Sequence, residues 1–133
     1  MPEANTPVAS LRRRWRSRRC VVVDGSMRPT LEPGDRLLVD PAPVRTALPG
    51  IGAIVVFRDP HAVERQLVKR VVERDPARDT VTVRGDAVEG SRDSRSFGDV
   101  PRHALVGIAW YRYLPLPRRG PLEAGAPDVR RQA

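Results

Sequence analysis

The chain has 133 residues, which is enough for one small domain with tails. Hydrophobic residues make up 40% of it and aromatic residues 5%, so an aliphatic core is expected, and the single cysteine, Cys20, excludes an internal disulfide and a cysteine metal cage. The formal net charge is +8, but the excess lies at the two ends of the chain, which argues against a nucleic-acid-binding surface on the folded part.

The two ends of the chain are predicted to be tails. Residues 1–19 hold six Arg and one Glu, residues 118–133 hold four Arg and two acidic residues, and neither segment shows an apolar period. We therefore expect a basic N-terminal arm at 1–19, a domain at 20–117 and a C-terminal tail at 118–133. The apolar runs fall short of the about 20 residues that a membrane span needs, and no secretory signal is visible. A cytoplasmic protein is expected, with at most weak peripheral contact between residues 12–19 and the inner face of a membrane.

Short Val-rich runs separated by Pro, Gly and Asp predict an all-β domain in the centre of the chain. Turns are expected at 32–35 and 75–79, where Pro fixes the backbone. No stretch shows a helical period of more than one or two turns, so the expected fold is a small, curled β-sheet with short helical turns. The expected strands are 20–24, 36–40, 53–58, 66–74, 80–84 and 105–114.

A serine at a strand-to-turn junction is the first candidate for chemistry. The run from Val21 to Val23 predicts a strand that ends at Gly25, so Ser26 stands at its edge. Pro29 cannot continue a sheet and suits the first turn of a short helix. A serine so placed can present its hydroxyl and its own backbone N–H to a substrate carbonyl. The same pattern also fits an ordinary turn, in which Ser and Gly are common.

Lys69 is the only lysine among 24 basic residues. In the strand expected at 66–74 it shares one face with Leu67 and Val71, whereas Arg70 lies on the other face. Apolar neighbours desolvate an ammonium group and lower its pKa, and a neutral amine can serve as a general base. Serine with a neutral lysine is a known form of activated nucleophile. The alternative is a half-exposed lysine whose stem covers apolar surface.

A polar segment at residues 84–101 is too highly charged for the core. Asp93 and Arg95 are spaced to form an ion pair, and Asp86 is expected to brace the loop through backbone N–H groups. By itself, this segment predicts structural bracing rather than catalysis.

Together, the three segments resemble the type I signal peptidase family of serine–lysine peptidases. The resemblance covers residues 20–114, and its pieces stand in the family's order. The matching pieces are Gly25-Ser26-Met27-Arg28-Pro29-Thr30-Leu31, Gly34-Asp35, residues 52–57, Lys69-Arg70-Val71, Gly85-Asp86 and Ser91-Arg92-Asp93-Ser94-Arg95. The family's catalytic core is a coiled, barrel-like all-β fold, in agreement with the expected strands.

The resemblance implies roles for the matched residues. Ser26 is similar to the acylating nucleophile of the family, and its backbone N–H is similar to a donor of the oxyanion hole. Lys69 is similar to the general base. Ser91 matches the position that orients the lysine amine, and Asp93 and Arg95 match a supporting pair. The supporting residues that the resemblance implies are Gly25, Met27, Asp86, Ser91, Asp93 and Arg95.

The chain departs from the family pattern in three places. An Arg-rich segment stands where members usually carry a membrane anchor, and only 15 residues separate Lys69 from Gly85, so no large inserted subdomain is expected. Asp24 stands two residues before Ser26, where some members have a Ser whose hydroxyl completes the oxyanion hole. A carboxylate there would oppose a developing anion. Where Gly-Asp-Asn is common, the third segment reads Gly-Asp-Ala up to Ala87.

The small form without an anchor is most similar to the proteases that mature nickel-containing superoxide dismutase. Such an enzyme removes a short N-terminal pro-segment. We therefore expect a serine endopeptidase that removes an N-terminal pro-segment or signal-like peptide from a precursor, with the nickel superoxide dismutase proenzyme as its partner.

Other chemistries have weaker support in the sequence. His61 and His103 lie beside proline-containing loops without a matched acid, and Cys20 is expected to be a small buried strand residue. The acidic and histidine residues follow no metal-loop spacing, so no metal or other cofactor is expected. Two other function classes stay open: a self-cleaving regulator of the repressor type, and a catalytically inactive β module that binds peptide.

Overall fold

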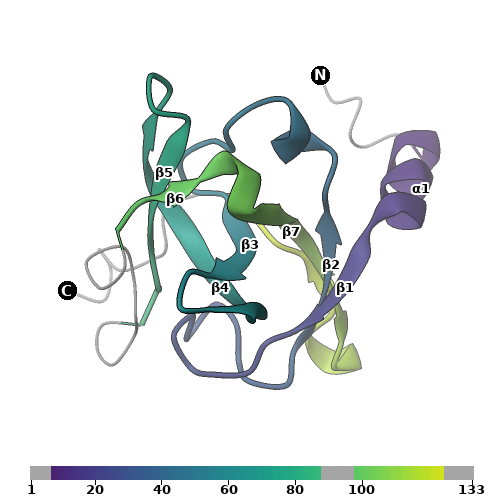
Figure 1. Ribbon diagram of the computed structural model, residues 1–133. Helices are drawn as coiled ribbons and strands as arrows, with labels where there is room; N and C mark the ends of the chain where they lie inside the picture. Colours follow the sequence, from purple (N-terminus) through teal and green to yellow (C-terminus); the bar gives the residue numbers. More distant parts are fainter. Residues whose placement is uncertain (1–6, 88–97, 125–133) are drawn as a thin grey trace.

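The Val-rich segments form one curled antiparallel sheet in the computed structural model, which describes residues 7–87 and 98–124 (Figure 1). Its described strands follow the order β1-β2-β7-β3-β4-β5-β6, and β8 pairs with β7. The all-β fold is thus confirmed, but over the described residues the sheet does not close into a barrel, because β1 and β6 remain its two edges. The strands are β1 (Arg18–Val21), β2 (Arg36–Asp40), β3 (Ile54–Asp59), β4 (Ala62–Asp75), β5 (Thr80–Arg84), β6 (Val100–Pro101), β7 (Leu105–Leu114) and β8 (Gly120–Pro121).

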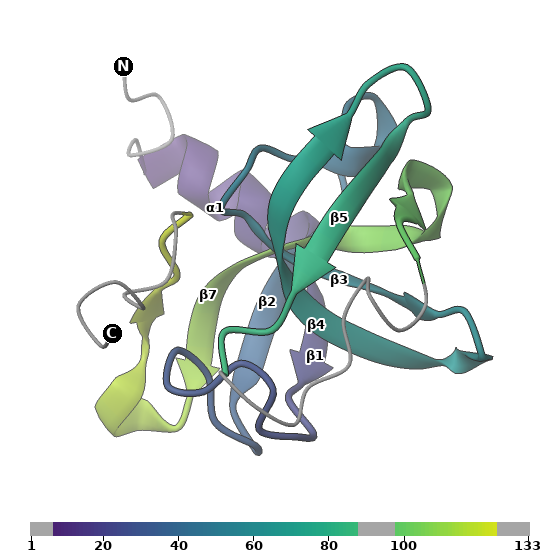
Figure 2. The ribbon, with the colours of Figure 1, turned by 90° about the vertical axis from the view of Figure 1, so that its left-hand side faces the viewer.

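The strands expected at 36–40, 80–84 and 105–114 coincide with β2, β5 and β7. The turn at 32–35 is also confirmed: Gly34 has a φ of +95°, and the Asp35 N–H donates to the Glu32 carbonyl at 3.0 Å. β4 is longer than expected and serves two hairpins, since it pairs first with β3 and then with β5 (Figure 2). A register shift between Val71 and Glu73 in the β4–β5 pairing helps the sheet to curl.

The core of the sheet is aliphatic, as the composition predicts. β3 contributes to two apolar clusters: Val55 and Phe57 pack in one, and Ile54 and Val56 pack in the other. Because successive side chains of a strand point to opposite faces, the uninterrupted apolar run of β3 reflects burial on both of its faces. β3 therefore lies at the centre of the domain, next to the strand that carries Lys69.

The helix α1 (Pro7–Arg16) corrects the expectation that no helix longer than one or two turns forms. It packs against β2, on the side of the sheet opposite β5 (Figure 1). Arg13 and Arg16 each hydrogen bond to the buried carboxylate of Asp40 at 2.8 Å. The Arg13 guanidinium also lies over the Trp110 ring, 4.8 Å from its centroid. Arg13 and Arg16 thus attach the helix through ion pairs, whereas its apolar side chains Leu11 and Trp15 are 54% and 81% exposed.

Short helical turns, as expected, join several strands. They are η2 (Pro43–Arg45), η3 (Arg102–Ala104) and η4 (Leu116–Arg118).

Candidate active site

Ser26 lies in the loop that connects β1 to β2, and this loop is anchored on both sides of it. Before Ser26, the Val22 N–H donates to the Asp35 carbonyl at 2.9 Å. After it, Met27 and Leu31 are buried in one apolar cluster, and the Leu31 N–H donates to the Met27 carbonyl at 2.9 Å. The anchored loop holds Ser26 at a fixed place, with only 8% of the residue exposed.

Lys69 lies on β4 and pairs with Val55 of β3. It is 1% exposed, and Leu67 and Val71 on either side of it are buried in an apolar cluster, as the sequence predicts. A cleft of about 930 Å³ is lined by both Lys69 and Ser26. The fold thus brings the only lysine of the chain to the cleft that holds the candidate nucleophile.

Asp24, which the sequence analysis noted as a departure from the family pattern, is hydrogen bonded to Ser26. Its Oδ1 accepts a hydrogen bond from the Ser26 backbone N–H at 3.0 Å. Burial raises the pKa of the Asp24 carboxyl, but hydrogen bonds from the Ser26 backbone and hydroxyl and the positive charges of Lys69 and Arg65 outweigh it, so the pKa lies below its usual range. The N–H expected to act as an oxyanion donor is therefore occupied by a carboxylate.

Asp86 braces the site through partners other than the backbone N–H groups that were expected. Its two carboxylate oxygens accept from Arg70 Nε at 2.9 Å and from Arg70 Nη2 at 2.7 Å, and Thr30 Oγ1 donates to it at 2.6 Å. The next residue, Ala87, donates its N–H to the Ser26 carbonyl at 2.9 Å. This segment therefore connects the strand of Lys69 with the loop of Ser26.

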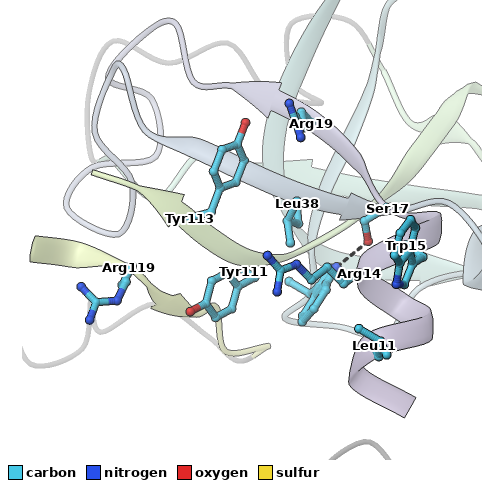
Figure 3. Close-up of a pocket in the computed structure, with 10 residues that line it drawn as sticks. Leu11, Arg14, Trp15, Ser17, Arg19, Leu38, Tyr111, Tyr113 and Arg119 are labelled. Atoms are coloured by element: carbon cyan, nitrogen blue, oxygen red, sulfur yellow. Dashed lines mark hydrogen bonds between the residues drawn. The ribbon is translucent and has the colours of Figure 1, made fainter. Parts of the chain in front are cut away.

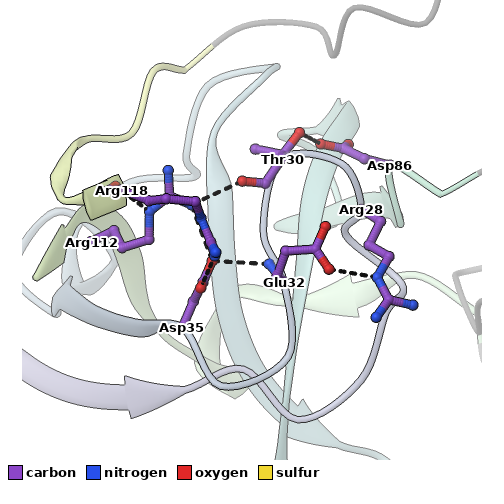
Figure 4. A network of polar contacts seen from close by, with 7 residues as sticks. All are labelled: Arg28, Thr30, Glu32, Asp35, Asp86, Arg112 and Arg118. Carbon is purple, nitrogen blue, oxygen red and sulfur yellow. Dashed lines mark hydrogen bonds and ion pairs between the residues drawn. The ribbon is translucent and has the colours of Figure 1, made fainter. Parts of the chain in front are cut away.

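A second polar cluster fixes the far end of the Ser26 loop (Figure 4). Asp35 accepts from the Glu32 N–H at 2.9 Å, from Arg112 Nη1 at 3.1 Å and from Arg118 Nη2. Arg112 also donates to the Thr30 carbonyl at 3.0 Å. The loop that carries Ser26 is thus held by β7 and η4 as well as by β4.

Comparisons with known proteins show the family to which the chain belongs. The family model described as "Signal peptidase, peptidase S26" matches residues 8–76, which include Ser26 and Lys69. The chain is 36% identical to the mitochondrial ATP-independent inner membrane protease subunit 1b of Arabidopsis thaliana over 118 residues, which cover 73% of this chain and 70% of that protein.

The chain belongs to the peptidase S26 signal peptidase family. It is also 29% identical to signal peptidase I of Leptolyngbya laminosa, over 73% of this chain and 68% of that protein. A protein of Synechocystis sp. named "Probable signal peptidase I-2" is 28% identical, over 84% of this chain and 68% of its own length.

Three of the residues expected in this site, Ser91, Asp93 and Arg95, lie outside the described residues. Two others, Gly25 and Met27, flank Ser26 in the loop after β1, and Met27 is buried. Sequence reasoning did not single out Arg70 as a partner of Asp86. Its position between Val68 and Val72 on one strand face was the available signal, because a charged residue with apolar neighbours usually has an ion-pair partner.

Of the remaining candidates, the two histidines lie outside the Ser26 cleft, whereas Cys20 is among the residues that line it. His61 and His103 are exposed, and neither is among the described residues that line the Ser26 cleft. Cys20 is buried in β1, as predicted, and burial raises the pKa of its thiol. Across residues 7–87 and 98–124, no helix has the length and apolar character needed to span a membrane.

A second hollow, of about 880 Å³, lies between α1 and the sheet (Figure 3). Leu11, Arg14 and Trp15 of α1 line one side of it, and Tyr111 and Tyr113 of β7 line the other. Its described lining shares a single residue, Arg19, with the Ser26 cleft. The two hollows thus share only Arg19, and of the two only the Ser26 cleft is lined by Lys69.

Proposed function

We propose that the protein is a serine endopeptidase in which Ser26 is the nucleophile and Lys69 the general base. The observation that carries the proposal is that the only lysine of the chain, 1% exposed, lines the cleft that holds Ser26. Burial penalises an ammonium ion relative to a neutral amine, and the neutral amine is the form that can accept a proton. No arginine could take this role, because a guanidinium does not lose its proton in proteins.

The reaction begins with attack by Ser26 Oγ on the carbonyl carbon of the scissile peptide bond. Lys69 Nζ accepts the hydroxyl proton as the C–O bond forms, and a tetrahedral oxyanion results. The ammonium of Lys69 then gives this proton to the leaving amine nitrogen as the C–N bond breaks. The product amine departs, and the remaining part of the substrate stays attached to Ser26 as an ester.

Hydrolysis of the ester restores the enzyme. Lys69 accepts a proton from water, and the hydroxide attacks the ester carbonyl. Collapse of the second tetrahedral intermediate breaks the bond to Ser26 Oγ, which regains its proton from Lys69. One water is consumed for each peptide bond that is cleaved.

For the substrate, we propose a precursor protein that loses an N-terminal pro-segment or signal-like peptide, and specifically the nickel superoxide dismutase proenzyme. The support is the compact form of the chain. β4 ends at Asp75 and β5 begins at Thr80, so the connection between Lys69 and Asp86 is a short hairpin rather than an inserted subdomain. This compactness is similar to that of the proteases that mature nickel superoxide dismutase.

The test is processing of the purified proenzyme by the wild-type chain and by Ser26→Ala, followed by mass measurement of the product. The wild type should release one N-terminal fragment, and Ser26→Ala should release none. Thr82→Ala is a matched control, because it removes an exposed hydroxyl on β5 that bonds to Asp99. If another precursor is cut and the dismutase proenzyme is not, the substrate assignment is wrong and the peptidase assignment stands.

We propose further that the protein works in the cytoplasm and that residues 12–19 make weak peripheral contact with an anionic membrane. Trp15 is 81% exposed, and Leu11 and Arg14 lie beside it on the same hollow. Exposed aromatic and aliphatic side chains among arginines are typical of surfaces that bind anionic lipid headgroups. Arg14→Gln with Trp15→Ala should reduce binding to phosphatidylglycerol vesicles, and high salt should release the wild type. Binding that resists salt, or that is unchanged in this variant, would contradict the proposal.

A further inference from the structure

The carboxylate of Asp24 occupies a backbone donor that the proposed reaction requires. Asp24 Oδ1 accepts the Ser26 N–H at 3.0 Å. In acyl transfer by a serine, such an N–H stabilises the oxygen that becomes negative in the transition state. A carboxylate in this place fills the donor and repels the developing anion. The observed arrangement therefore cannot stabilise an oxyanion at this N–H until Asp24 moves.

The same carboxylate also acts on the general base. Asp24 interacts electrostatically with Lys69 and Arg65, and all three residues line one cleft. A negative neighbour favours the protonated form of Lys69, which has no lone pair to accept the Ser26 proton. The Asp24 carboxylate therefore opposes both the Ser26 N–H as an oxyanion donor and Lys69 as a general base. The charged residues that line the cleft with Lys69 are Arg19, Asp24, Arg28, Glu64 and Arg65.

Asp24 is placed where it can leave this position. It lies in an exposed bend, whereas Ser26 and Lys69 are buried. Rotation about the side-chain torsions of Asp24 would carry its carboxylate into solvent without moving the anchored Ser26 loop. A substrate backbone entering the cleft can supply a carbonyl oxygen in its place.

We propose that Asp24 is an inhibitory latch, in which its carboxylate holds the Ser26 N–H in the resting protein and is displaced when a peptide substrate enters. This inference rests on the proposed function. It makes Asp24 a positioning residue, because Asp24 acts through Ser26 and Lys69 rather than on the substrate.

The test compares Asp24→Asn and Asp24→Ala with the wild type in peptide cleavage across a pH series. Asp24→Asn removes the charge and keeps an oxygen acceptor, whereas Asp24→Ala removes both. The latch predicts that kcat/KM at neutral pH rises in both variants, and by roughly tenfold in Asp24→Ala. The reason is that the charge-assisted hydrogen bond from the Ser26 N–H to Asp24 no longer competes with the substrate oxygen for this N–H. The midpoint of the acidic limb should also move to lower pH, by about one unit, because Lys69 loses a negative neighbour. Glu73→Gln, which removes an exposed carboxylate on β4 outside the cleft, should leave both readouts unchanged.

Other results of these measurements would contradict the latch. If Asp24 only braces the loop, Asp24→Ala should lose activity and thermal stability, and Asp24→Asn should keep the wild-type pH profile. That result overturns the latch and leaves the proposed function standing, provided that cleavage still requires Ser26. If Asp24→Ala does not fold, the pH profile of Asp24→Asn decides the question. Cleavage that persists in Ser26→Ala would overturn the proposed function and the latch together.

Discussion

Arg70 and Asp86 form a buried, two-point ion pair that connects β4 to the segment after β5. The Arg70 Nη2 and Asp86 Oδ2 atoms are 2.7 Å apart, and the two side chains are 4% and 1% exposed. Arg70 Nη1 also donates to the Gly52 carbonyl at 2.8 Å. Lys69 directly precedes Arg70, and Ser26 accepts the N–H of Ala87. The ion pair therefore fixes the backbone on which both candidate catalytic residues depend.

Breaking this pair should cost substantial stability. Asp86→Asn leaves the Arg70 guanidinium buried without its counter-charge, and such changes typically cost about 3–5 kcal/mol. Urea unfolding followed by fluorescence measures the loss. Asp99→Asn is the matched control, because Asp99 makes an exposed hydrogen bond to Thr82 and should cost less than about 0.5 kcal/mol. A loss below about 1 kcal/mol in Asp86→Asn would contradict the structural role given to the pair.

Lys69 should be dispensable for folding and required for cleavage. Lys69→Met replaces the buried amine with an apolar side chain of similar length, so the variant loses the polar contacts of the amine and also the cost of burying it. These two effects oppose each other, so the free energy of unfolding should stay within about 1 kcal/mol of the wild type, while cleavage falls by at least about 10³-fold. Urea unfolding and a peptide cleavage assay on the same preparation separate the two effects. A folded Lys69→Met variant that cleaves normally would exclude Lys69 as the base.

The attachment of α1 should weaken in acid. Burial raises the pKa of the Asp40 carboxyl, but the Arg16 hydrogen bonds, the Ala42 N–H and the charge of Arg13 lower it more, so its pKa lies below the usual range. Because the folded-state pKa lies below that of the unfolded chain, this contribution is complete above the unfolded pKa of about 4 and is lost as pH falls through the folded pKa. Asp40→Asn removes it.

The stability difference between the wild type and Asp40→Asn should therefore depend on pH. We expect about 1–3 kcal/mol at pH 7 and a steadily smaller difference as the pH falls from about 5 to about 2. Urea unfolding at a series of pH values gives the curve. A difference that stays constant down to pH 2 would mean that the Asp40 carboxylate does not attach the helix.

Cys20 should be inert in the folded protein. Burial raises the pKa of its thiol, so less thiolate is present at neutral pH, and the side chain is buried in β1. Iodoacetamide at pH 7.5, followed by mass measurement, should label Cys20 only after denaturation. Rapid labelling of the native protein at a rate near that of a free thiol would show that β1 opens readily at this edge of the sheet.

The sequence predicted most strands well, because Val-rich runs bounded by Pro and Gly carry local information. The strand expected at 20–24 was misplaced, since β1 begins at Arg18 and ends at Val21. β2, β5 and β7 fall where they were expected, and burial of Lys69 follows from its apolar neighbours on β4. The helix α1 was missed because its stabilising partners, Asp40 and Trp110, are far away in the sequence. Nothing in the local sequence identifies Asp40 as the partner of Arg13 and Arg16.

The opposite faces of β4 on which Lys69 and Arg70 lie were likewise predictable, and the ion-pair partner of Arg70 was not. The alternation of strand faces put Lys69 and Arg70 on opposite sides of β4, but nothing local identified Asp86 as the partner of Arg70. The place of Asp24 on the Ser26 N–H depends on how the loop bends after β1. Short-range patterns indicate which residues are available for chemistry, while the contacts between them depend on the tertiary fold.

The most direct test of the serine–lysine mechanism is the rate at which a serine-reactive acylating probe labels Ser26 in the wild type and in Lys69→Arg. The label is located by mass spectrometry of the peptide that contains Ser26. Arginine keeps the positive charge and cannot act as a base. We predict one label per wild-type chain, on Ser26, and labelling at least about 10³-fold slower in Lys69→Arg. Labelling of Lys69→Arg at the wild-type rate, or a wild-type label on another residue, would contradict the mechanism.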